Sequence, residues 1–392
     1  ESTFPFICEA PIVATGTKLG LATMCGGGGN NNLPRGQVVL KGGVTFASGG
    51  GCLVPQGFIT LGGTSVCGDL KMAESLVTYY NAYRSGNDRD YTRRGELTIL
   101  KGGSLTVQNQ TTVNSATSSL WIAKGGQVKV SGSWNWETAE NEHQVNGLLD
   151  LDATVGGSAT QGYFGTGVLK VKVTDGTDGA KMRLGEGLTL APTTANWGTM
   201  PIDMTSDLTI SNATDWTYAV QGGLEVSGPG HKLTVDGAGT TTFATAVSGY
   251  DFDICKKGTG TLVLDENANG LARGTLDLQA GTIVFKKPQG IGRFAFNSGA
   301  TIALGSSNGQ IAALTVKDDV NLTGLTLKVA DDATAELMKE DWTDLLTVPW
   351  GFELTGEPTF AGADIKWRPH QNADGSTSLQ GKVRKGLMLI FR

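Results

Sequence analysis

The stretch "GTGTLVLDENANGLARGTLDLQAGTIVF", residues 258–285, repeats one short phrase three times, as Thr-Leu-Val-Leu, Thr-Leu-Asp-Leu and Thr-Ile-Val-Phe. Apolar residues alternate with other residues in each phrase, which predicts strands with one buried face and one wet face. Glycine, asparagine or Asp-Gly bounds the phrases and marks the turns. Similar phrases recur along the chain as ELTIL (96–100), SLTV (104–107), QVKV (127–130), DLTI (207–210), KLTVD (232–236) and ALTVK (313–317).

The spacing of the phrases indicates how the strands are arranged. The residues expected to point inward recur at nearly equal intervals, first between positions 128 and 208 and again between positions 262 and 302. A recurrence of about 20 residues is the size of one coil of a β-solenoid, in which stacked coils bury one continuous apolar column. We therefore predict an all-β protein with a right-handed β-solenoid (β-helix) over residues 94–330. Its expected core contains Leu97, Val128, Leu149, Leu169, Leu188, Leu208, Leu262, Ile283 and Ile302. A pair of antiparallel β-sandwiches is the alternative, because it also gives short alternating strands.

The two ends of the chain differ from this middle region. Residues 1–93 contain four cysteines and a segment, 70–85, with apolar residues at helical spacing, so we expect an N-terminal cap with a short helix. Residues 331–392 are expected to form a C-terminal cap with a short helix over 331–346, beginning near Asp331 or Asp332, and a terminal strand. Atypical segments of this kind are expected to cover the open ends of a solenoid.

Composition and charge exclude several classes of protein. The chain has 392 residues, 58 of them glycine, 17% charged residues and a formal net charge of −6. No basic face stands out, so nucleic acid is not an expected partner. No apolar run approaches the roughly 18–20 residues that a membrane-spanning helix needs. The chain begins at Glu1 rather than Met, which is the expected result of removing a signal peptide.

Four of the five cysteines, Cys8, Cys25, Cys52 and Cys67, are clustered near the beginning of the chain. In an exported protein they could form two disulfides, and the order along the chain favours Cys8–Cys25 and Cys52–Cys67 among three connectivities. Buried free thiols are the alternative. Cys255 is expected to be a buried free thiol. There is no C-x-x-C motif and the three histidines are isolated, so a zinc site is not expected.

Residues 258–285 also resemble a known family. G-T-G-T-L-V-L, an Asn/Gly-rich turn and G-T-L-D-L-Q-A-G-T-I-V are similar to the autotransporter-associated β-strand repeat, found in passenger regions of bacterial surface proteins. Residues 94–107 and 297–307 match more loosely. The turn "ENANGLARG" lacks the usual aromatic residue.

The resemblance implies an exported β-helix at a bacterial cell surface. An autotransporter ends in a membrane β-barrel of many strands, and the segment that follows position 330 is too short to form one. The expectation is therefore a processed passenger or a surface protein exported in another way.

Some β-solenoids degrade polysaccharides, so paired carboxylates need testing as catalytic groups. The candidates are Asp150 with Asp152, Asp175 with Asp178, and Asp251 with Asp253. The first and last pairs have i, i+2 spacing, which places both carboxylates on the wet face of a strand. The middle pair lies in "TDGTDG", and the Asp-Gly steps there are typical of turns. We predict no catalytic residue, no cofactor and no metal site. Structural calcium at the Asp-rich turns stays open, although the sequence contains neither the calcium-binding nonapeptide repeat nor an EF-hand loop.

The function that fits these features is an extracellular structural protein, a subunit that self-assembles with copies of itself into a surface filament, sheath or layer. A monomeric adhesin or glycan-binding passenger is the alternative, with surface glycans as partners and tryptophans for stacking. A polysaccharide-degrading enzyme is the third reading.

The expected assembly segment is 386–391, because its alternating residues are apolar on both faces and a strand of this kind favours burial on both sides. Its apolar residues are Leu387, Met388, Leu389, Ile390 and Phe391. Pairing within its own chain, as the last cap strand, is the other possibility.

Overall fold

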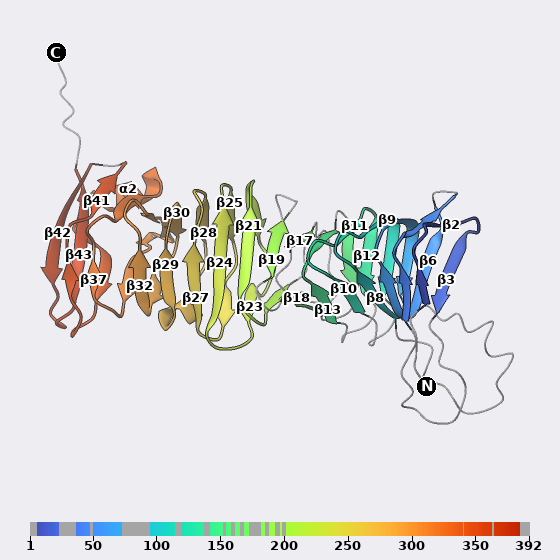
Figure 1. The fold of residues 1–392 in the computed structure, drawn as a ribbon. Helices are drawn as coiled ribbons and strands as arrows, with labels where there is room; N and C mark the ends of the chain where they lie inside the picture. The colour runs from blue at the N-terminus through green and yellow to red at the C-terminus, as the bar shows by residue number, and fades with distance from the viewer. Residues whose placement is uncertain are drawn as a thin grey trace, which may run out of the picture. The chain divides into compact units, whose positions relative to one another are not determined.

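The computed structural model describes residues 6–22, 37–47, 50–72, 95–113, 119–136, 142–151, 154–157, 161–164, 168–171, 182–184, 188–192, 197, 201–339, 341–362 and 364–384. The chain divides into two compact units, Glu1–Asp203 and Met204–Arg392. Each unit is a stack of short parallel strands (Figure 1).

Unit 1 is built from strands of three to ten residues that follow one another around successive coils. They are β1 (Phe6–Cys8), β2 (Ile12–Ala14), β3 (Lys18–Ala22), β4 (Gln37–Leu40), β5 (Val44–Phe46), β6 (Cys52–Leu61), β7 (Thr64–Met72), β8 (Gly95–Ile99), β9 (Ser104–Val113), β10 (Ser119–Ile122), β11 (Gln127–Val130), β12 (Ser133–Trp136), β13 (Glu142–Val145), β14 (Leu148–Leu151), β15 (Thr154–Gly157), β16 (Gln161–Phe164), β17 (Val168–Val171), β18 (Met182–Leu184) and β19 (Thr189–Pro192). β20 (Ile202–Met204) contains the boundary between the units.

The strands of unit 1 stack in three faces. One face contains β1, β4, the second half of β6, β8, β10, β13, β16 and β18. The second contains β2, β5, the first halves of β7 and β9, β11, β14, β17 and β19. The third contains β3, the first half of β6, the second halves of β7 and β9, β12 and β15. All of these pairings are parallel, as in a parallel β-solenoid, and they exclude the antiparallel sandwich for the described part of unit 1.

Unit 2 repeats the arrangement. Its strands up to the end of the coils are β21 (Leu208–Asn212), β22 (Trp216–Tyr218), β23 (Leu224–Val226), β24 (His231–Gly237), β25 (Thr240–Phe243), β26 (Val247–Gly249), β27 (Phe252–Lys256), β28 (Thr261–Leu264), β29 (Thr275–Leu278), β30 (Thr282–Phe285), β31 (Gln289–Ile291), β32 (Arg293–Phe296), β33 (Thr301–Leu304), β36 (Leu314–Val316), β37 (Val320–Asn321), β38 (Thr326–Val329), β39 (Thr343–Val348), β40 (Leu354–Thr355) and β41 (Thr359–Ala361). One face runs β22-β25-β28-β30-β33-β38-β41, with every neighbouring pair parallel.

The remaining elements of unit 2 are a 3-10 helix, η1 (Asn269–Ala272), a short α-helix, α2 (Asp332–Leu337), and two hairpins. The small hairpin joins β34 (Ser306–Ser307) to β35 (Gln310–Ile311). At the other, β43 (Thr377–Val383) pairs antiparallel with both β39 and β42 (Ile365–Gln371). Within the described part of unit 2, antiparallel pairing is confined to these two places.

The column that the sequence predicted in residues 262–302 is confirmed. Leu262 pairs with Ile283 and Ile283 with Ile302, and each of the three side chains is fully buried. The middle phrase of the opening stretch, β29, lies on a different face from its two neighbours, β28 and β30, so three phrases supply two faces of adjacent coils. Strand alternation and coil spacing were thus enough to predict this register.

One position of the predicted column in unit 1 is wrong. Val128 pairs with Leu149 and Leu149 with Leu169, but the next partner is Leu190 rather than Leu188. Leu188 is buried, yet it lies before the start of β19. Leu188 and Leu190 flank Thr189, and their intervals from Leu169, 19 and 21 residues, are equally close to about 20, so spacing alone does not choose between them.

The ends of the predicted solenoid also differ from expectation. Strand pairing does not change near residue 94, because β6 pairs in parallel with β8, and the described strands of residues 6–22, 37–47 and 50–72 form coils of the same kind. Residues 70–72 of the expected helix at 70–85 belong to β7, and the rest of that segment lies outside the described residues. α2 starts where the sequence placed a helix, with the Asp331 side chain accepting from the Thr334 backbone N–H at 2.8 Å. It ends at Leu337, and residues 343–346 of the expected helix belong to strand β39.

Candidate functional site

The carboxylates considered as catalytic groups are engaged between coils. Asp251 forms an ion pair with Arg273 Nε at 2.7 Å, and Asp253 Oδ1 accepts a hydrogen bond from the Thr275 backbone N–H at 2.6 Å. Asp150 lies in register with a lysine on each neighbouring strand, Lys129 on β11 and Lys170 on β17. The structure therefore places these three carboxylates where they can hold adjacent coils together. Asp152, Asp175 and Asp178 lie outside the described residues.

The contact made by Asp253 belongs to a recurring arrangement in unit 2. An aspartate at or near the start of a strand accepts the backbone N–H of a residue one coil further on, over 2.6 to 2.8 Å. The pairs are Asp207 with Lys232, Asp215 with Thr240, Asp253 with Thr275, and Asp319 with Glu353. The Thr240 N–H also holds the pKa of Asp215 below its ordinary value. We call these contacts the aspartate clamps. They are not evident from the sequence, because the two partners of each contact are separated by 22 to 34 residues.

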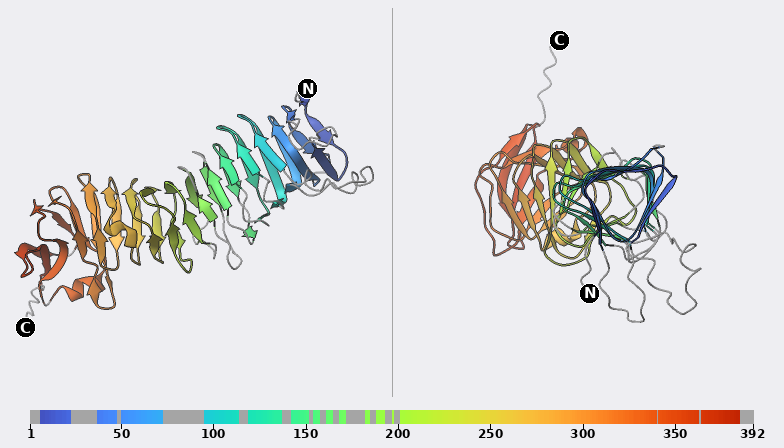
Figure 2. Two further views of the ribbon diagram at one scale, coloured as in Figure 1. Left: turned by 90° about the horizontal axis from the view of Figure 1, so that it is seen from below. Right: turned by 45° about the vertical axis from the view of Figure 1, so that its right-hand side comes forward.

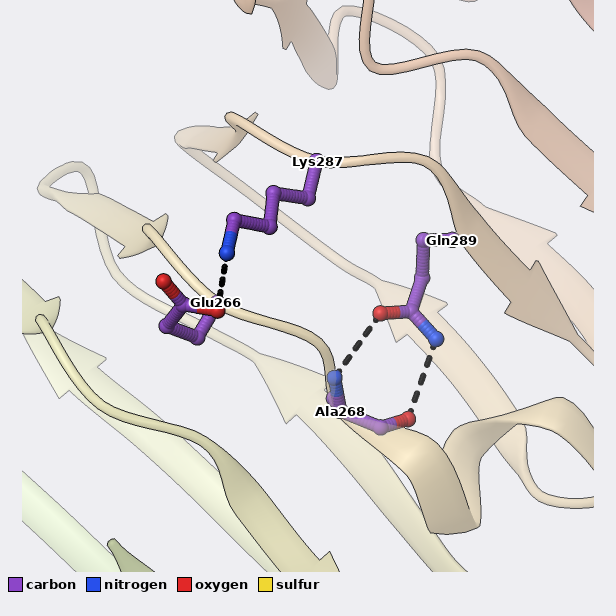
Figure 3. A network of polar contacts seen from close by, with 4 residues as sticks. All are labelled: Glu266, Ala268, Lys287 and Gln289. Carbon is purple, nitrogen blue, oxygen red and sulfur yellow. Dashed lines mark hydrogen bonds and ion pairs between the residues drawn. The ribbon is translucent and has the colours of Figure 1, made fainter. Parts of the chain in front are cut away.

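Gln289 and Lys256 are among the buried polar side chains of unit 2. The Gln289 amide bonds to the backbone of Ala268 in the preceding coil, while Lys287 pairs with Glu266 beside it (Figure 3). Lys256 is 1% exposed, and its Nζ donates to the carbonyl oxygens of Lys257 and Gly258. Burial lowers the pKa of Lys256, against the opposite effect of nearby Asp236. These contacts satisfy backbone groups at coil corners.

The cysteines are distributed over both faces of the strands. Cys8 and Cys67 have free thiols, and Cys25 lies outside the described residues. Cys67 is buried and in register with the core residue Val107, whereas Cys52 is in register with the polar Lys18 and Asp69. A disulfide needs side chains that point toward each other, so this register disfavours Cys52–Cys67. Burial, with smaller effects of Cys52 and Asp69, raises the pKa of Cys67 to about 12.

Cys255 is a buried free thiol, as expected. Its Sγ donates to Asp277 Oδ2 at 3.6 Å. Burial raises the pKa of the Cys255 thiol most, and the nearby charge of Asp277 raises it further. Within the described ranges, no group of three or more His, Cys, Asp or Glu side chains could hold a metal ion.

Most tryptophans with described side chains are packed rather than displayed. Trp134, Trp197 and Trp216 are buried, and Trp342 lies under the Arg368 guanidinium, 4.3 Å from the ring centroid. Among the described tryptophans two are exposed: Trp121, on β10, is 43% exposed, and Trp350, in the turn that follows β39, is 81% exposed. The side chain of Trp136 lies outside the described set.

The described part of unit 1 begins with an incompletely covered coil. We call β1, β2 and β3 the first coil; among the described residues they pair with β4, β5 and β6 on one side only (Figure 2). Phe6 and Cys8 alternate with Ile7, and Cys8 is in register with the buried Leu40, so Phe6 points toward the core. Phe6 is nevertheless 63% exposed.

The next coil shows what the first coil lacks. The inward residues of the first coil (Phe6, Cys8, Ile12, Ala14, Leu19 and Leu21) are all at least partly exposed. Their partners Leu40, Val44, Phe46, Leu53 and Pro55 in the second coil are buried, and Val38 is partly exposed. Ile7 and Val13, which point outward, are also exposed. The first coil is therefore an apolar end with one set of strand edges facing away from the stack.

Unit 2 ends differently. Its seven-stranded parallel face ends at β41, and its five-stranded sheet ends at β42, whose residues include Lys366, Arg368 and Pro369. Charged side chains and proline are the usual protection of an edge strand against further pairing. β43 ends at Val383, and the Arg384 N–H is bonded to the Asp364 carbonyl oxygen at 2.8 Å. The predicted assembly residues Leu387, Met388, Leu389, Ile390 and Phe391 follow outside the described residues.

Comparisons with protein-family models, with curated proteins and with solved structures found no match. In the described part of the chain, no helix is both long and apolar enough to cross a membrane. The first coil is the candidate functional site that the geometry singles out.

Proposed function

We propose that the protein is an extracellular structural protein, a β-solenoid subunit that assembles with copies of itself into a surface filament, sheath or layer. The observation that supports this most directly is the exposure of the inward-pointing Phe6 in the first coil. An inward residue of a solenoid is buried only when a coil lies on each side of it. A further layer of strand, supplied by another copy, would complete the column.

The energetics favour such an addition. Burying one large apolar side chain contributes about 1.5–3 kcal/mol, and Phe6, Ile7 and Val13 are all exposed together at this end. Strand edges with outward-facing N–H and C=O groups are templates for pairing with another chain. A contact between two different parts of the subunit is heterologous, and repetition of such a contact gives rings or open filaments.

The handedness of the coils is part of the same proposal. We assign the coils a right-handed sense, because a parallel strand–crossover–strand connection is right-handed in about 98% of cases. The resemblance of residues 258–285 to the autotransporter-associated repeat supports export to a bacterial surface. The proposed partners are therefore other copies of the chain, at the surface or in a secreted assembly.

A structural rather than catalytic function is supported by the carboxylates. Asp251 and Asp253 are engaged by Arg273 and the Thr275 backbone, which leaves them as contacts between coils. We propose that the protein is not an enzyme. Activity on a polysaccharide that disappears in Asp251→Asn or Asp253→Asn, with the fold retained, would contradict this.

Size-exclusion chromatography with light scattering, followed by negative-stain microscopy, tests assembly. The expected result is a population whose mass rises with protein concentration and particles longer than one subunit. A chain that stays a single copy over the whole range, from about 1 µM to about 100 µM, would reject the proposal, because a weaker contact would not sustain an assembly.

A monomeric glycan-binding adhesin is the second candidate, and the observation that favours it is Trp350. Its indole is 81% exposed. An exposed indole offers a face for stacking on a sugar ring. A glycan array tests this directly: binding that is lost in Trp350→Ala, by a protein that remains a single copy, supports the adhesin over the assembling subunit.

A further inference from the structure

We propose that the edge of the first coil is an acceptor site for segment 386–391 of a second copy of the chain, which adds to it as an extra strand. The inference rests on the proposed self-assembly and identifies its contact. The edge, formed by β1 and β2, is called the acceptor edge below.

Backbone hydrogen bonds show which residues of the acceptor edge face away from the stack. Lys41 N–H donates to the Cys8 carbonyl oxygen, and Ile12 N–H donates to the Gly43 carbonyl oxygen, at 2.8 and 3.0 Å. Ala14 accepts from Ala47 N–H in the same direction, at 2.9 Å.

Alternate residues of a paired strand direct their N–H and C=O groups to opposite sides. The residues between these contacts, Ile7 and Val13, therefore direct their backbone groups toward the acceptor edge.

The side chains at the acceptor edge require an apolar occupant. Ile7 is 48% exposed and Val13 is 60% exposed, and the inward Phe6 is exposed beside them. A polar strand could satisfy the backbone groups but would leave these apolar surfaces in water or desolvate its own side chains. An extended apolar strand fits both requirements, as in other cases of strand addition to an exposed edge.

Segment 386–391 has the matching chemistry. Leu387, Leu389 and Phe391 alternate with Met388 and Ile390, so an extended strand there is apolar on both sides. One side would cover the inward residues of the first coil and the other would extend the outer apolar surface. Lys385 and Arg392 flank it. Glu9 lies between β1 and β2, where it pairs with Lys41 at 2.7 Å while its side chain is 71% exposed.

The position of the segment explains why a second copy is the expected recipient of this strand. The preceding hairpin, β42–β43, ends the five-stranded sheet of unit 2 with a protected edge, and the Arg384–Asp364 contacts hold the chain where it leaves the hairpin. A donor at one unit and an acceptor at the other give each copy one of each, which is the requirement for head-to-tail growth.

The test uses two variants of the full chain with complementary defects. Val13→Pro removes the N–H group that faces the acceptor edge. It keeps the backbone hydrogen bonds that Ile12 and Ala14 make to Gly43 and Ala47, on either side of β5. Deletion of residues 386–392 removes the donor. Val13→Thr is the matched control, since it keeps the N–H and the branched shape. Circular dichroism and the thermal transition establish that each variant is folded.

The expected result is that each variant alone stays a single copy, whereas an equimolar mixture forms a one-to-one dimer that does not grow. Val13→Thr should assemble like the full chain. Only a contact between copies restores association when the two variants are mixed. If the strand pairs within its own chain, both variants and their mixture stay single copies, and this result would overturn the inference.

A peptide competition provides a readout that does not depend on the folding of a variant. The peptide RKGLMLIFR, residues 384–392, should shorten the assemblies of the full chain, and a scrambled peptide of the same composition should not. If the full chain assembles and Val13→Pro, the truncation and the peptide all leave assembly unchanged, the acceptor site is wrong while the proposed function stands. If the full chain never assembles, the proposed function fails first.

Discussion

The side chain of Gln289 takes the place of a strand opposite Ala268. Its Oε1 accepts from the Ala268 N–H at 2.9 Å and its Nε2 donates to the Ala268 carbonyl oxygen at 3.0 Å (Figure 3). Ala268 forms an isolated parallel bridge with Val247 on the other side and leads into η1. The glutamine thus continues the hydrogen-bonded face where the coil makes a helical turn instead of a strand.

Replacing the Gln289 amide by an apolar side chain of similar size should destabilise the fold. Gln289→Leu leaves both buried backbone groups of Ala268 without these bonds, and we expect a loss of about 2–4 kcal/mol in the free energy of unfolding. Gln289→Glu keeps an acceptor for the Ala268 N–H but loses the donor, so an intermediate loss is expected. Urea unfolding measures both; equal stability of all three proteins would contradict the role given to the amide.

Removal of an aspartate clamp should weaken the junction between two coils. Asp253→Ala deletes the acceptor of the Thr275 N–H, and hydrogen bonds to charged groups contribute about 1.5–3 kcal/mol. Hydrogen exchange should show the faster opening first at β29, because coils contact mainly their neighbours. Asp341→Ala, a change at an exposed aspartate, is the control. Uniform acceleration over unit 2 would mean that the clamp acts globally rather than locally.

The column through β28, β30 and β33 gives a packing prediction. Ile283 is fully buried between Leu262 and Ile302. Ile283→Ala should therefore lower the free energy of unfolding by about 2–5 kcal/mol. Thr282→Ala, at the half-buried neighbouring position, should cost much less. Calorimetry distinguishes the two; similar losses at both positions would indicate that the column is not the main source of stability.

Strand period and coil spacing were sufficient to predict parallel coils and the pairing of Leu262 with Ile283, because both depend on a local pattern repeated at a steady interval. They placed Leu188 in the column in place of Leu190, because the intervals of 19 and 21 residues from Leu169 fit a coil of about 20 residues equally well. They also began the coils too late, because β6 and β7, of ten and nine residues, each run across two faces as one strand and are not short phrases bounded by turns.

The polar contacts that join the coils could not be predicted from the sequence. Gln289, Lys256 and Asp253 look like ordinary turn or surface residues, and their partners are identified only once the coils are stacked in register. The exposure of the first coil could not be predicted from the sequence either, because an inward residue such as Phe6 is exposed or buried according to whether another layer covers it. The apolar character of segment 386–391 was visible from alternation alone.

The raised pKa of Cys67 predicts a protected thiol. With a pKa of about 12, roughly one molecule in ten thousand has the reactive thiolate at pH 8. Ellman's reagent should therefore modify the partly exposed Cys8 rapidly and Cys67 only after unfolding. Mass mapping of the labelled peptides identifies each site. Rapid labelling of Cys67 in the folded protein, or a bridge to Cys52 under non-reducing conditions, would contradict the buried free thiol.

The buried Lys256 predicts a specific dependence of stability on pH. Burial lowers its pKa in the folded state below the ordinary value of 10.5, so the unfolded chain binds more protons between the two pKa values. Stability rises with pH wherever the unfolded state binds more protons, so the Lys256 contribution should increase as the pH approaches that ordinary value and then level off.

Lys256→Met should remove this increase and also cost about 1–3 kcal/mol at every pH, because the carbonyl oxygens of Lys257 and Gly258 lose their donor. The difference in free energy of unfolding between wild type and Lys256→Met should therefore widen from pH 7 to pH 10. Lys257→Met, at the neighbouring exposed position, measures the effect of removing one surface charge. Chemical denaturation at each pH provides the measurement, and a difference that narrows as pH rises would show that Lys256 is stabilised in its charged form by Asp236 rather than penalised by burial.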